Sequence, residues 1–286
     1  MNRTVIHPAQ KGPTRMRTRA ALLTIPLLAV TLSGQQPAAP AAPAAAQPQP
    51  PAAPSCPEMA SALTRLMGAD ARQRDWPLLT RYRDANRAVA KPAAGELRVV
   101  FMGDSITDAW PNARFGDYFA TNKGYIGRGI SGQTTPQMLL RFRPDVIDLK
   151  PRAVVILAGT NDIAANTGPM TNEEIQNNIM SMAELARANK IKVVLSSILP
   201  VSNYHVVATL GPQTALRPME RIRAVNDWMK KYAAAEGHVY LDYFPAMLDQ
   251  SGLLRSELSG DDLHPNAQGY AIMAPLADAA IKQALK

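Results

Sequence analysis

Short apolar runs alternate with amphipathic segments along the last two thirds of the chain. Apolar runs the length of one strand, each followed by a stretch with helical periodicity, indicate a parallel β-sheet with helices on both faces. The pattern therefore predicts an α/β domain built on a five-stranded, doubly wound parallel sheet. The five strands are expected at residues 97–102, 125–130, 153–158, 191–198 and 239–241.

The segments between these runs carry helix signals. Thr171 and Glu174 have the spacing of a capping box, and the apolar positions that follow repeat at helical intervals. Residues 219–235 show the same amphipathic repeat. A last helix is expected after Pro265, with a kink at Pro275, because proline cannot donate a backbone hydrogen bond.

The beginning of the chain differs in composition from the sheet region. Arginines at positions 15, 17 and 19 precede the apolar run 20–32, whose 13 residues fall short of the roughly 20 that span a membrane. Residues 1–35 are therefore predicted to be a signal peptide region, with an uncleaved anchor as the alternative. A signal peptide implies an exported protein, periplasmic or secreted, that keeps no stable membrane span.

Two further segments precede the sheet region. Residues 36–57 consist almost entirely of Pro, Ala and Gln, which is typical of an extended linker that cannot form a core. Residues 58–96 show a helical pattern with breaks expected at Gly68 and Pro77, and are predicted to form an N-terminal helical preface. The main domain is expected to cover residues 97–286.

Composition narrows the class of partner. The formal net charge is +8, but residues 1–57 carry five basic and no acidic side chains, which leaves 26 basic and 23 acidic residues in the remainder. This small excess, without a basic run inside the domain, gives no reason to expect nucleic acid as a partner. Cys56 is the only cysteine, so neither an intramolecular disulfide nor a cysteine zinc site can form.

A serine follows the first predicted strand, where a parallel sheet places its ligand cleft. Ser105 lies in the run Gly-Asp-Ser-Ile-Thr at 103–107, at the start of the next helix. The helix dipole and the free N–H groups there stabilise negative charge, so Ser105 is a candidate nucleophile. The alternative is a serine that only caps the N-terminus of the helix, because the same sequence pattern fits that role. The run is not the Gly-x-Ser-x-Gly elbow of α/β-hydrolases, because its fifth residue is Thr107.

Two further candidates follow the second and third strands. Gly132 leaves its backbone N–H unobstructed by a side chain, and Asn161 brings a side-chain amide to the same edge of the sheet. Both can donate to an oxyanion, together with the N–H of Ser105. Taken singly, Gly132 fits an ordinary glycine turn and Asn161 fits an Asx-turn.

A histidine near the end of the chain is the candidate base. Asp261 and His264 lie three residues apart, so one turn of the loop would bring both side chains to the same side. Asp261 would then orient the imidazole, with Asp262 as the rival acid. The other histidines fit this role less well. No partner carboxylate is expected near His205, whose role stays open. His7 lies in the leader, and His238 lies at the start of a predicted strand.

Together these motifs resemble those of the SGNH/GDSL hydrolase family, named after the Ser, Gly, Asn and His of four sequence blocks. The resemblance covers residues 97–285, with Ile106 where the family name has leucine. The stretches 129–135 and 151–162 look most like the branch that includes the catalytic subunits of platelet-activating-factor acetylhydrolase and bacterial lysophospholipase-like esterases. That branch favours short acyl groups.

The resemblance implies a three-layer α/β/α sandwich with flavodoxin-like strand order. It also implies a serine esterase with the catalytic residues Ser105, Asp261 and His264, and an oxyanion hole formed by Ser105, Gly132 and Asn161. Asp104 and Asp162 are expected to have a structural role and to pin the two loops through backbone hydrogen bonds.

Such an esterase needs no metal and no other cofactor. Its partner would be a small acyl ester, first of all acetylated polysaccharide, with lysophospholipids and aryl esters as alternatives. A non-catalytic glycan- or protein-binding domain is the alternative of another class. A nucleotide-binding module is not supported, because no Gly-x-Gly-x-x-Gly follows the first strand, and the sequence gives no indication of oligomeric state.

Overall fold

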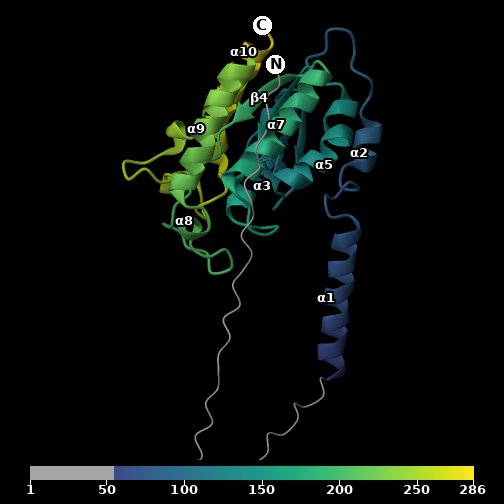
Figure 1. Cartoon of the computed structure of the whole chain (residues 1–286), viewed down its shortest axis with the longest axis vertical. Coiled ribbons are helices and arrows are strands. Elements are labelled where there is room, and N and C mark those ends of the chain that lie inside the picture. The colour runs from purple at the N-terminus through teal and green to yellow at the C-terminus, as the bar shows by residue number, and fades with distance from the viewer. Residues whose placement is uncertain (1–54) are drawn as a thin grey trace, which may run out of the picture. The chain divides into compact units, whose positions relative to one another are not determined.

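The computed structural model describes residues 55–286, so the predicted signal peptide region 1–35 and most of the predicted linker 36–57 lie outside the described residues. Figure 1 shows the arrangement of helices and strands in the described part.

Four short 3-10 helices lie at Ala113–Phe115, Ile147–Leu149, Pro245–Met247 and Ser256–Leu258. The strands are β1 (Val99–Gly103), β2 (Tyr125–Gly129), β3 (Ala153–Leu157), β4 (Lys192–Ser196) and β5 (Val239–Leu241). The α-helices are α1 (Cys56–Arg74), α2 (Arg83–Ala88), α3 (Ser105–Ala109), α4 (Tyr118–Thr121), α5 (Thr135–Asp145), α6 (Thr160–Ile163), α7 (Asn172–Ala188), α8 (Gln213–Leu216), α9 (Met219–Glu236) and α10 (Ala267–Ala284).

The five strands form one parallel sheet in the order β2-β1-β3-β4-β5. This confirms the predicted fold class, a five-stranded sheet of flavodoxin-like order with helices on both faces. Four of the five strands are slightly shorter than the apolar runs, because pairing stops where the neighbouring strand stops, and β5 spans its predicted residues. Gly103 pairs with Leu157 and Leu157 with Ser196, so these three strands end together at one edge.

Alternate residues of each central strand enter two separate apolar cores. On one face, Val100 and Met102 of β1 and their counterparts on β3 and β4 pack against α5, α7 and α9. On the other face, Val99 and Phe101 pack against α3 and α10. Both sides of a strand are therefore buried, which explains why the strands read as continuous apolar runs.

α10 also fixes the position of α3, the helix that begins with Ser105. The Tyr270 hydroxyl donates to the Ile106 carbonyl oxygen at 2.7 Å, and its ring stacks on Trp110 with centroids 5.3 Å apart. Tyr270 is 1% exposed. Because a buried hydroxyl requires a partner, this bond ties the register of α10 to the first turn of α3.

One helix break expected from the sequence is not found. α1 continues through Gly68 to Arg74, because glycine lowers helix stability by only about 1 kcal/mol and does not by itself end a helix. α10 runs through Pro275, with the buried residues Met273 and Ala277 on either side of it packed against the sheet. The kink expected at Pro275 stays a prediction, because a continuous helix can still bend at a proline.

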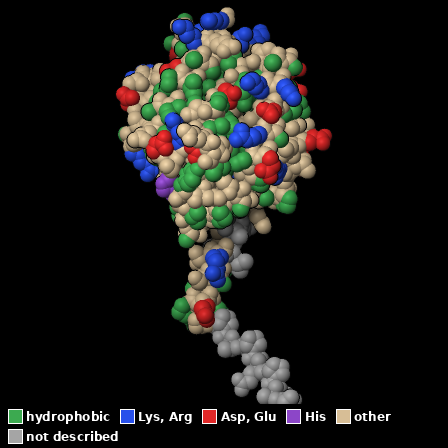
Figure 2. Space-filling view, turned by 90° about the vertical axis from the view of Figure 1, so that its left-hand side faces the viewer, with side chains coloured by type: hydrophobic (Ala, Val, Ile, Leu, Met, Phe, Trp, Pro, Cys, Tyr) green, Lys and Arg blue, Asp and Glu red, His purple; other side chains and the backbone are tan. Residues whose placement is uncertain are grey.

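The surface of the described part is mixed in charge. Figure 2 shows one face, on which Lys and Arg side chains lie interspersed with Asp and Glu. Between residues 55 and 286, no helix has both the length and the apolar character required to cross a membrane.

Candidate active site

The candidate residues collect at the carboxyl edge of the sheet, beside the point where the strand order reverses between β1 and β3. Ser105 follows β1 as the first residue of α3, and Asn161 follows β3 in α6. Gly132 lies in the turn between β2 and α5, and His264 lies in the loop before α10. Doubly wound sheets bind ligands at this topological position.

Ser105, His264 and Asp261 form one chain of hydrogen bonds. His264 Nε2 lies 2.8 Å from Ser105 Oγ, and His264 Nδ1 lies 2.7 Å from Asp261 Oδ2. The side chains of His264 and Asp261 are about one-third and one-quarter exposed, at 32% and 27%. The histidine is therefore reachable from solvent and held from behind by a carboxylate.

The loop around Asp261 explains the three-residue spacing. Asp261 Oδ1 accepts hydrogen bonds from the N–H groups of Leu263 and His264, at 3.1 and 2.7 Å. Burial raises the pKa of Asp261, but the hydrogen bonds from the His264 side chain and backbone outweigh it and hold the pKa well below its ordinary value. Asp261 therefore stays ionised beside the imidazole.

Asp262, the rival acid, faces a different loop. It is 1% exposed and has a left-handed backbone, with φ of 67°. Its carboxylate accepts hydrogen bonds from the Ser202 hydroxyl at 2.6 Å and from the N–H groups of Tyr204 and His205 at 2.9 and 2.6 Å. The expectation that no carboxylate lies near His205 is wrong, because His205 Nδ1 is 3.3 Å from Asp262 Oδ1.

The candidate oxyanion donors line the same hollow as Ser105. Gly132 has φ of 79°, a conformation that side-chain-bearing residues rarely adopt. Within residues 55–286, the backbone N–H groups of Ser105 and Gly132 donate to no protein acceptor. The Asn161 amide is 3% exposed, and its Nδ2 donates one hydrogen bond, to the Gln133 carbonyl oxygen at 3.0 Å.

Asp104 and Asp162 hold the loops, as expected from the sequence. Asp104 accepts from the Ile106 N–H at 2.9 Å, and Asp162 accepts from the N–H of Thr135 at 2.8 Å. Burial raises the pKa of Asp104 to about 6, opposed by the hydrogen bond from Ile106 and by the electrostatic interaction with His264 and Arg217. Burial likewise raises the pKa of Asp162.

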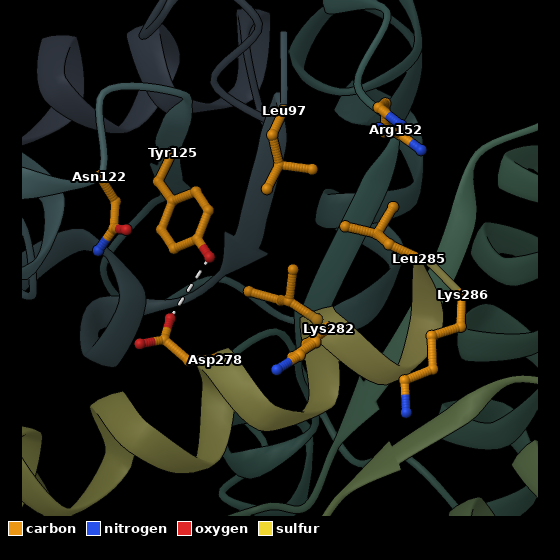
Figure 3. Close-up of a pocket in the computed structure, with 9 residues that line it drawn as sticks. Leu97, Asn122, Tyr125, Arg152, Asp278, Lys282, Leu285 and Lys286 are labelled. Atoms are coloured by element: carbon orange, nitrogen blue, oxygen red, sulfur yellow. Dashed lines mark hydrogen bonds between the residues drawn. The ribbon is translucent and has the colours of Figure 1, made fainter. Parts of the chain in front are cut away.

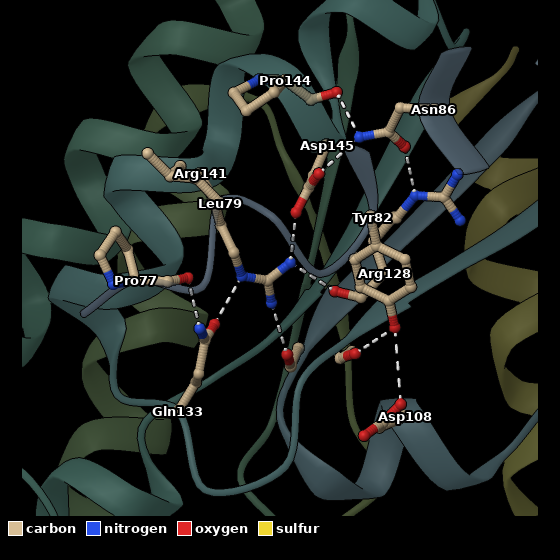
Figure 4. A network of polar contacts seen from close by, with 12 residues as sticks. Pro77, Leu79, Tyr82, Asn86, Asp108, Arg128, Gln133, Arg141, Pro144 and Asp145 are labelled. Atoms are coloured by element: carbon tan, nitrogen blue, oxygen red, sulfur yellow. Dashed lines mark hydrogen bonds and ion pairs between the residues drawn. The ribbon is translucent and has the colours of Figure 1, made fainter. Parts of the chain in front are cut away.

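A polar network behind the Gly132 turn connects β1, β2 and the preface segment (Figure 4). Its centre is Arg141, which is fully buried and pairs with Asp145 at 2.9 Å. The guanidinium also donates to the carbonyl oxygens of Gly103 and Arg128, at 2.9 and 2.8 Å, and to the side-chain oxygen of Gln133. Arg141 therefore joins the ends of β1 and β2 to the turn.

The preface segment covers the outer side of this network. Gln133 Nε2 donates to the Pro77 carbonyl oxygen at 2.7 Å, and the Tyr82 hydroxyl donates to the carbonyl oxygen of Gly129. Asn86 bonds to Asp145 at 2.6 Å. None of these contacts was expected from the sequence, because their partners lie more than 45 residues apart along the chain.

The hollow beside Ser105 has a volume of about 440 Å³. Sequence reasoning missed one of its walls, which belongs to the segment between β4 and α9 and has no catalytic motif. This wall consists of Thr209, Leu210, Gln213, Leu216 and Arg217. Leu210 and Leu216 are 37% and 43% exposed, so the wall presents apolar surface to a bound molecule.

A second hollow, of about 490 Å³, lies at the other edge of the sheet (Figure 3). It lies beside Leu97 and Arg152, which precede β1 and β3, and beside the end of α10. The Tyr125 hydroxyl donates to Asp278 there at 3.4 Å. Neither serine nor histidine lines this hollow, so it lacks the groups gathered around Ser105.

Residues 55–286 contain no cluster of three or more His, Cys, Asp or Glu side chains suited to a metal ion.

Comparison with known proteins gives consistent matches. The model of the GDSL-like Lipase/Acylhydrolase family matches residues 101–272. The solved structure of a GDSL-like lipase from Bacteroides thetaiotaomicron is 44% identical in sequence, with a TM-score of 0.67. That alignment covers 73% of this chain and 99% of the lipase.

Of two curated relatives, one has a lower sequence identity to this chain than the lipase, and the other matches a shorter part of the chain. The platelet-activating factor acetylhydrolase IB subunit alpha1 of Bos taurus is 27% identical, over 65% of this chain and 75% of its own length. An uncharacterized lipoprotein of Bacillus subtilis is 35% identical over 28% of this chain. This chain spans about a third of that lipoprotein's length, 34%.

Proposed function

This chain belongs to the GDSL-like lipase/acylhydrolase family, a class of carboxylic ester hydrolases, and we propose that Ser105 is its nucleophile. The family expected from the sequence motifs is thereby confirmed. The observation that carries the proposal is the hydrogen-bonded chain from Ser105 Oγ through His264 to Asp261, with distances of 2.8 and 2.7 Å. A hydroxyl, an imidazole and an ionised carboxylate in this order are the parts of an activated serine.

His264 Nε2 takes the proton from Ser105 as Oγ forms a bond to the ester carbonyl carbon. The tetrahedral intermediate collapses when the bond to the alcohol oxygen breaks, and the departing alcohol receives the proton from His264. Water then attacks the acyl-enzyme by the same route and releases the carboxylic acid. Asp261 holds the imidazole in the required tautomer and stabilises its charged form throughout.

The oxyanion of the intermediate accepts hydrogen bonds from the N–H groups of Ser105 and Gly132 and from the Asn161 amide. These donors are fixed before the reaction, because α3, the Gly132 turn and α6 are each held by buried hydrogen bonds. Donors that need no reorganisation stabilise the transition state more than the ground state.

The substrate we propose is a short acyl ester, acetyl first, on a carbohydrate alcohol. The hollow of about 440 Å³ combines polar groups, such as Asn166 and Gln213, with the leucines of the opposite wall. A sugar presents hydroxyl groups at its rim and C–H groups on its faces, so both kinds of lining are used. The similarity to an acetylhydrolase subunit supports a small acyl group.

A lysophospholipid or aryl ester is the second candidate. Val206 is 57% exposed and Tyr204 is 48% exposed, on the same segment as Leu210 and Leu216. Exposed apolar side chains on a segment that also lines the hollow favour an apolar alcohol or chain.

Replacement of the nucleophile tests the proposal most directly. Ser105→Ala should abolish hydrolysis of p-nitrophenyl acetate and labelling by a fluorophosphonate probe, with unchanged thermal unfolding. Ser131→Ala is the matched control and should still be labelled, because its hydroxyl donates to Asp108 at 2.9 Å and contacts no histidine. Wild-type protein that takes up no probe would support a non-catalytic glycan- or protein-binding domain.

Substrate class is tested by comparing acetate release from acetylated xylan with cleavage of lysophosphatidylcholine. The carbohydrate proposal expects the larger kcat/KM on the xylan. Activity on the lipid alone would replace it with the second candidate.

Export is a further part of the proposal. It rests on the arginines and the apolar run within residues 1–35 and on the similarity to a lipoprotein. Expression of the full chain in a bacterial host, followed by N-terminal sequencing of the mature protein, should find a new N-terminus after residue 32 and activity outside the cytoplasm. An intact Met1 in the cytoplasmic fraction would reject it.

A further inference from the structure

Arg217 is a buried cation directly behind Asn161. It follows α8, at the end of the segment that forms one wall of the hollow, and is 4% exposed. Its Nε donates to Thr160 Oγ1 at 3.0 Å, its Nη1 to the Gln213 side-chain oxygen at 2.5 Å, and its Nη2 to Asn161 Oδ1 at 3.3 Å. All three acceptors are neutral.

This guanidinium has no counter-ion at contact distance. Among the described residues, no carboxylate oxygen lies within 4.0 Å of it, whereas buried Arg141 pairs with Asp145 at 2.9 Å. Burial lowers the pKa of Arg217, and the more distant carboxylates of Asp104 and Asp261 oppose this effect, so the arginine stays charged at neutral pH. Burying a charge without a contacting counter-ion lowers the stability of the fold, so buried charges are normally ion-paired. Exceptions to this pattern are found mainly at functional sites.

The contacts of Arg217 decide which way the Asn161 amide faces. The oxygen and nitrogen ends of an amide have nearly the same shape, but only the nitrogen end can donate to an oxyanion. Arg217 has donors only, so it can meet only Oδ1 of Asn161. The carbonyl oxygen of Gln133 is an acceptor only, so it can meet only Nδ2. The second N–H of Nδ2 remains for the substrate.

We propose that Arg217 is a positioning residue for ester hydrolysis, which fixes the Asn161 amide with its N–H toward the oxyanion. The inference rests on the proposed function, because it requires an oxyanion that forms at Ser105. Its effect falls on kcat, since the negative charge exists only in the transition state and intermediate.

Removal of the guanidinium should slow turnover without weakening substrate binding. Loss of one oxyanion donor typically costs about 100-fold to 1,000-fold in kcat, and a misoriented amide should cost part of that. Arg217→Met is therefore expected to lower kcat on p-nitrophenyl acetate by about 10-fold to 100-fold, with KM nearly unchanged. A rise in KM with unchanged kcat would overturn the assignment.

A double variant separates positioning from an independent effect. If Arg217 acts through Asn161, Asn161→Ala/Arg217→Met should be only slightly slower than Asn161→Ala, within about threefold. If the two losses multiply in full, Arg217 does not act through the amide and the positioning assignment is wrong.

Two controls exclude a general loss of structure. Arg223→Met, on the neighbouring helix α9, removes a hydrogen bond to the Gly252 carbonyl oxygen outside the hollow and should leave kcat unchanged. Complete fluorophosphonate labelling of Arg217→Met, at a lower rate, shows that the Ser105 site has formed. Absence of labelling in the wild type is a failure of the proposed function and not of the role of Arg217.

Arg217→Lys keeps the test decisive if the methionine variant does not fold. Lysine retains the charge but has no planar fork to meet three acceptors. Its kcat should lie between those of wild type and Arg217→Met, with unchanged KM. Wild-type kcat in Arg217→Lys would overturn the orienting part of the proposal.

Discussion

Two buried arginines lie behind donors of the candidate oxyanion hole, and only one of them has a carboxylate at ion-pair distance. Arg141, behind the Gly132 turn, is neutralised by Asp145 at 2.9 Å and bonds to three further oxygens. Arg217, behind Asn161, meets only neutral acceptors. The carboxylate of Asp145 largely neutralises the charge of Arg141, so Arg141 mainly stabilises the fold. Arg217 has no carboxylate in contact, so its electric field acts more strongly on charges that form nearby.

The comparison predicts a stability effect for one arginine and a rate effect for the other. Arg141→Met should lower the free energy of unfolding by about 3–5 kcal/mol, because Asp145 is then buried without its partner. Urea unfolding monitored by circular dichroism measures this. Arg143→Met, on the exposed side of the same helix, is the control and should change stability by at most about 0.5 kcal/mol.

The outcome that breaks the comparison is an Arg141→Met protein of normal stability whose kcat falls as far as that of Arg217→Met. Both arginines would then act on the reaction, and ion pairing would not distinguish them.

The pH dependence of stability tests whether the charge of Arg217 acts on a nearby carboxyl group, that of Asp104. The pKa of Asp104 rises to about 6 in the folded protein, so its stabilising contribution is complete below its ordinary pKa and is lost as pH rises through 6. As pH rises from about 4 to about 6, the wild type should lose up to about 3 kcal/mol of unfolding free energy relative to Asp104→Asn, which does not titrate at this position. Unfolding titrations at several pH values measure the difference.

Arg217→Met extends the same experiment. The positive charge of Arg217 lowers the pKa of Asp104, so its removal should move the upper end of this pH window to higher pH. An unchanged window would mean that the Arg217 charge does not reach the first turn of α3.

Gln133 is the residue at which the two regions meet. Its side chain bonds to Arg141 and to the Pro77 carbonyl oxygen, while its backbone oxygen accepts from Asn161. Gln133→Leu should cost about 1–3 kcal/mol of stability, because a buried N–H of Arg141 loses its acceptor. Its kcat should fall far less than in Asn161→Ala, since the backbone contact remains. Equal losses of kcat would show that the regions are not separable.

The smallest effect is expected at the preface segment. Tyr82→Phe removes the hydroxyl that bonds to the Gly129 carbonyl oxygen and should cost about 1 kcal/mol. Tyr232→Phe is the matched control and should change thermal unfolding little, because that ring keeps its stacking on Trp228. A preface that contributes nothing to the domain would give the same melting temperature for both variants.

Much of the fold could be predicted from the sequence, because both faces of each central strand are buried. Continuous apolar runs such as 153–157 and the capping box at Thr171 have one local explanation each. Strand ends were less predictable, since Leu97 belongs to an apolar run but lies outside the paired region and is 42% exposed. Where a strand ends depends on its neighbours.

The candidate site could be predicted where a motif lies within a few residues. Asp261 and His264 are three residues apart, and Ser105 begins a helix directly after a strand. Spacing favours Asp261 over Asp262 as the partner of His264, and the hydrogen bond between Asp261 and His264 agrees with that choice. A left-handed backbone at Asp262 and the loop at Ser202 direct the second carboxylate away from His264.

The sequence by itself determined the order of the elements, the alternation of strands and helices, and the chemical types gathered after the strands. Tertiary structure alone decided that Arg217 lies behind Asn161, 56 positions away in the chain, and that Arg141 contacts a carboxylate while Arg217, among the described residues, contacts none. The physical reason is that an amphipathic repeat or a cap is a local property of the chain. The field at a buried atom instead depends on every charge and dipole that folding brings near it.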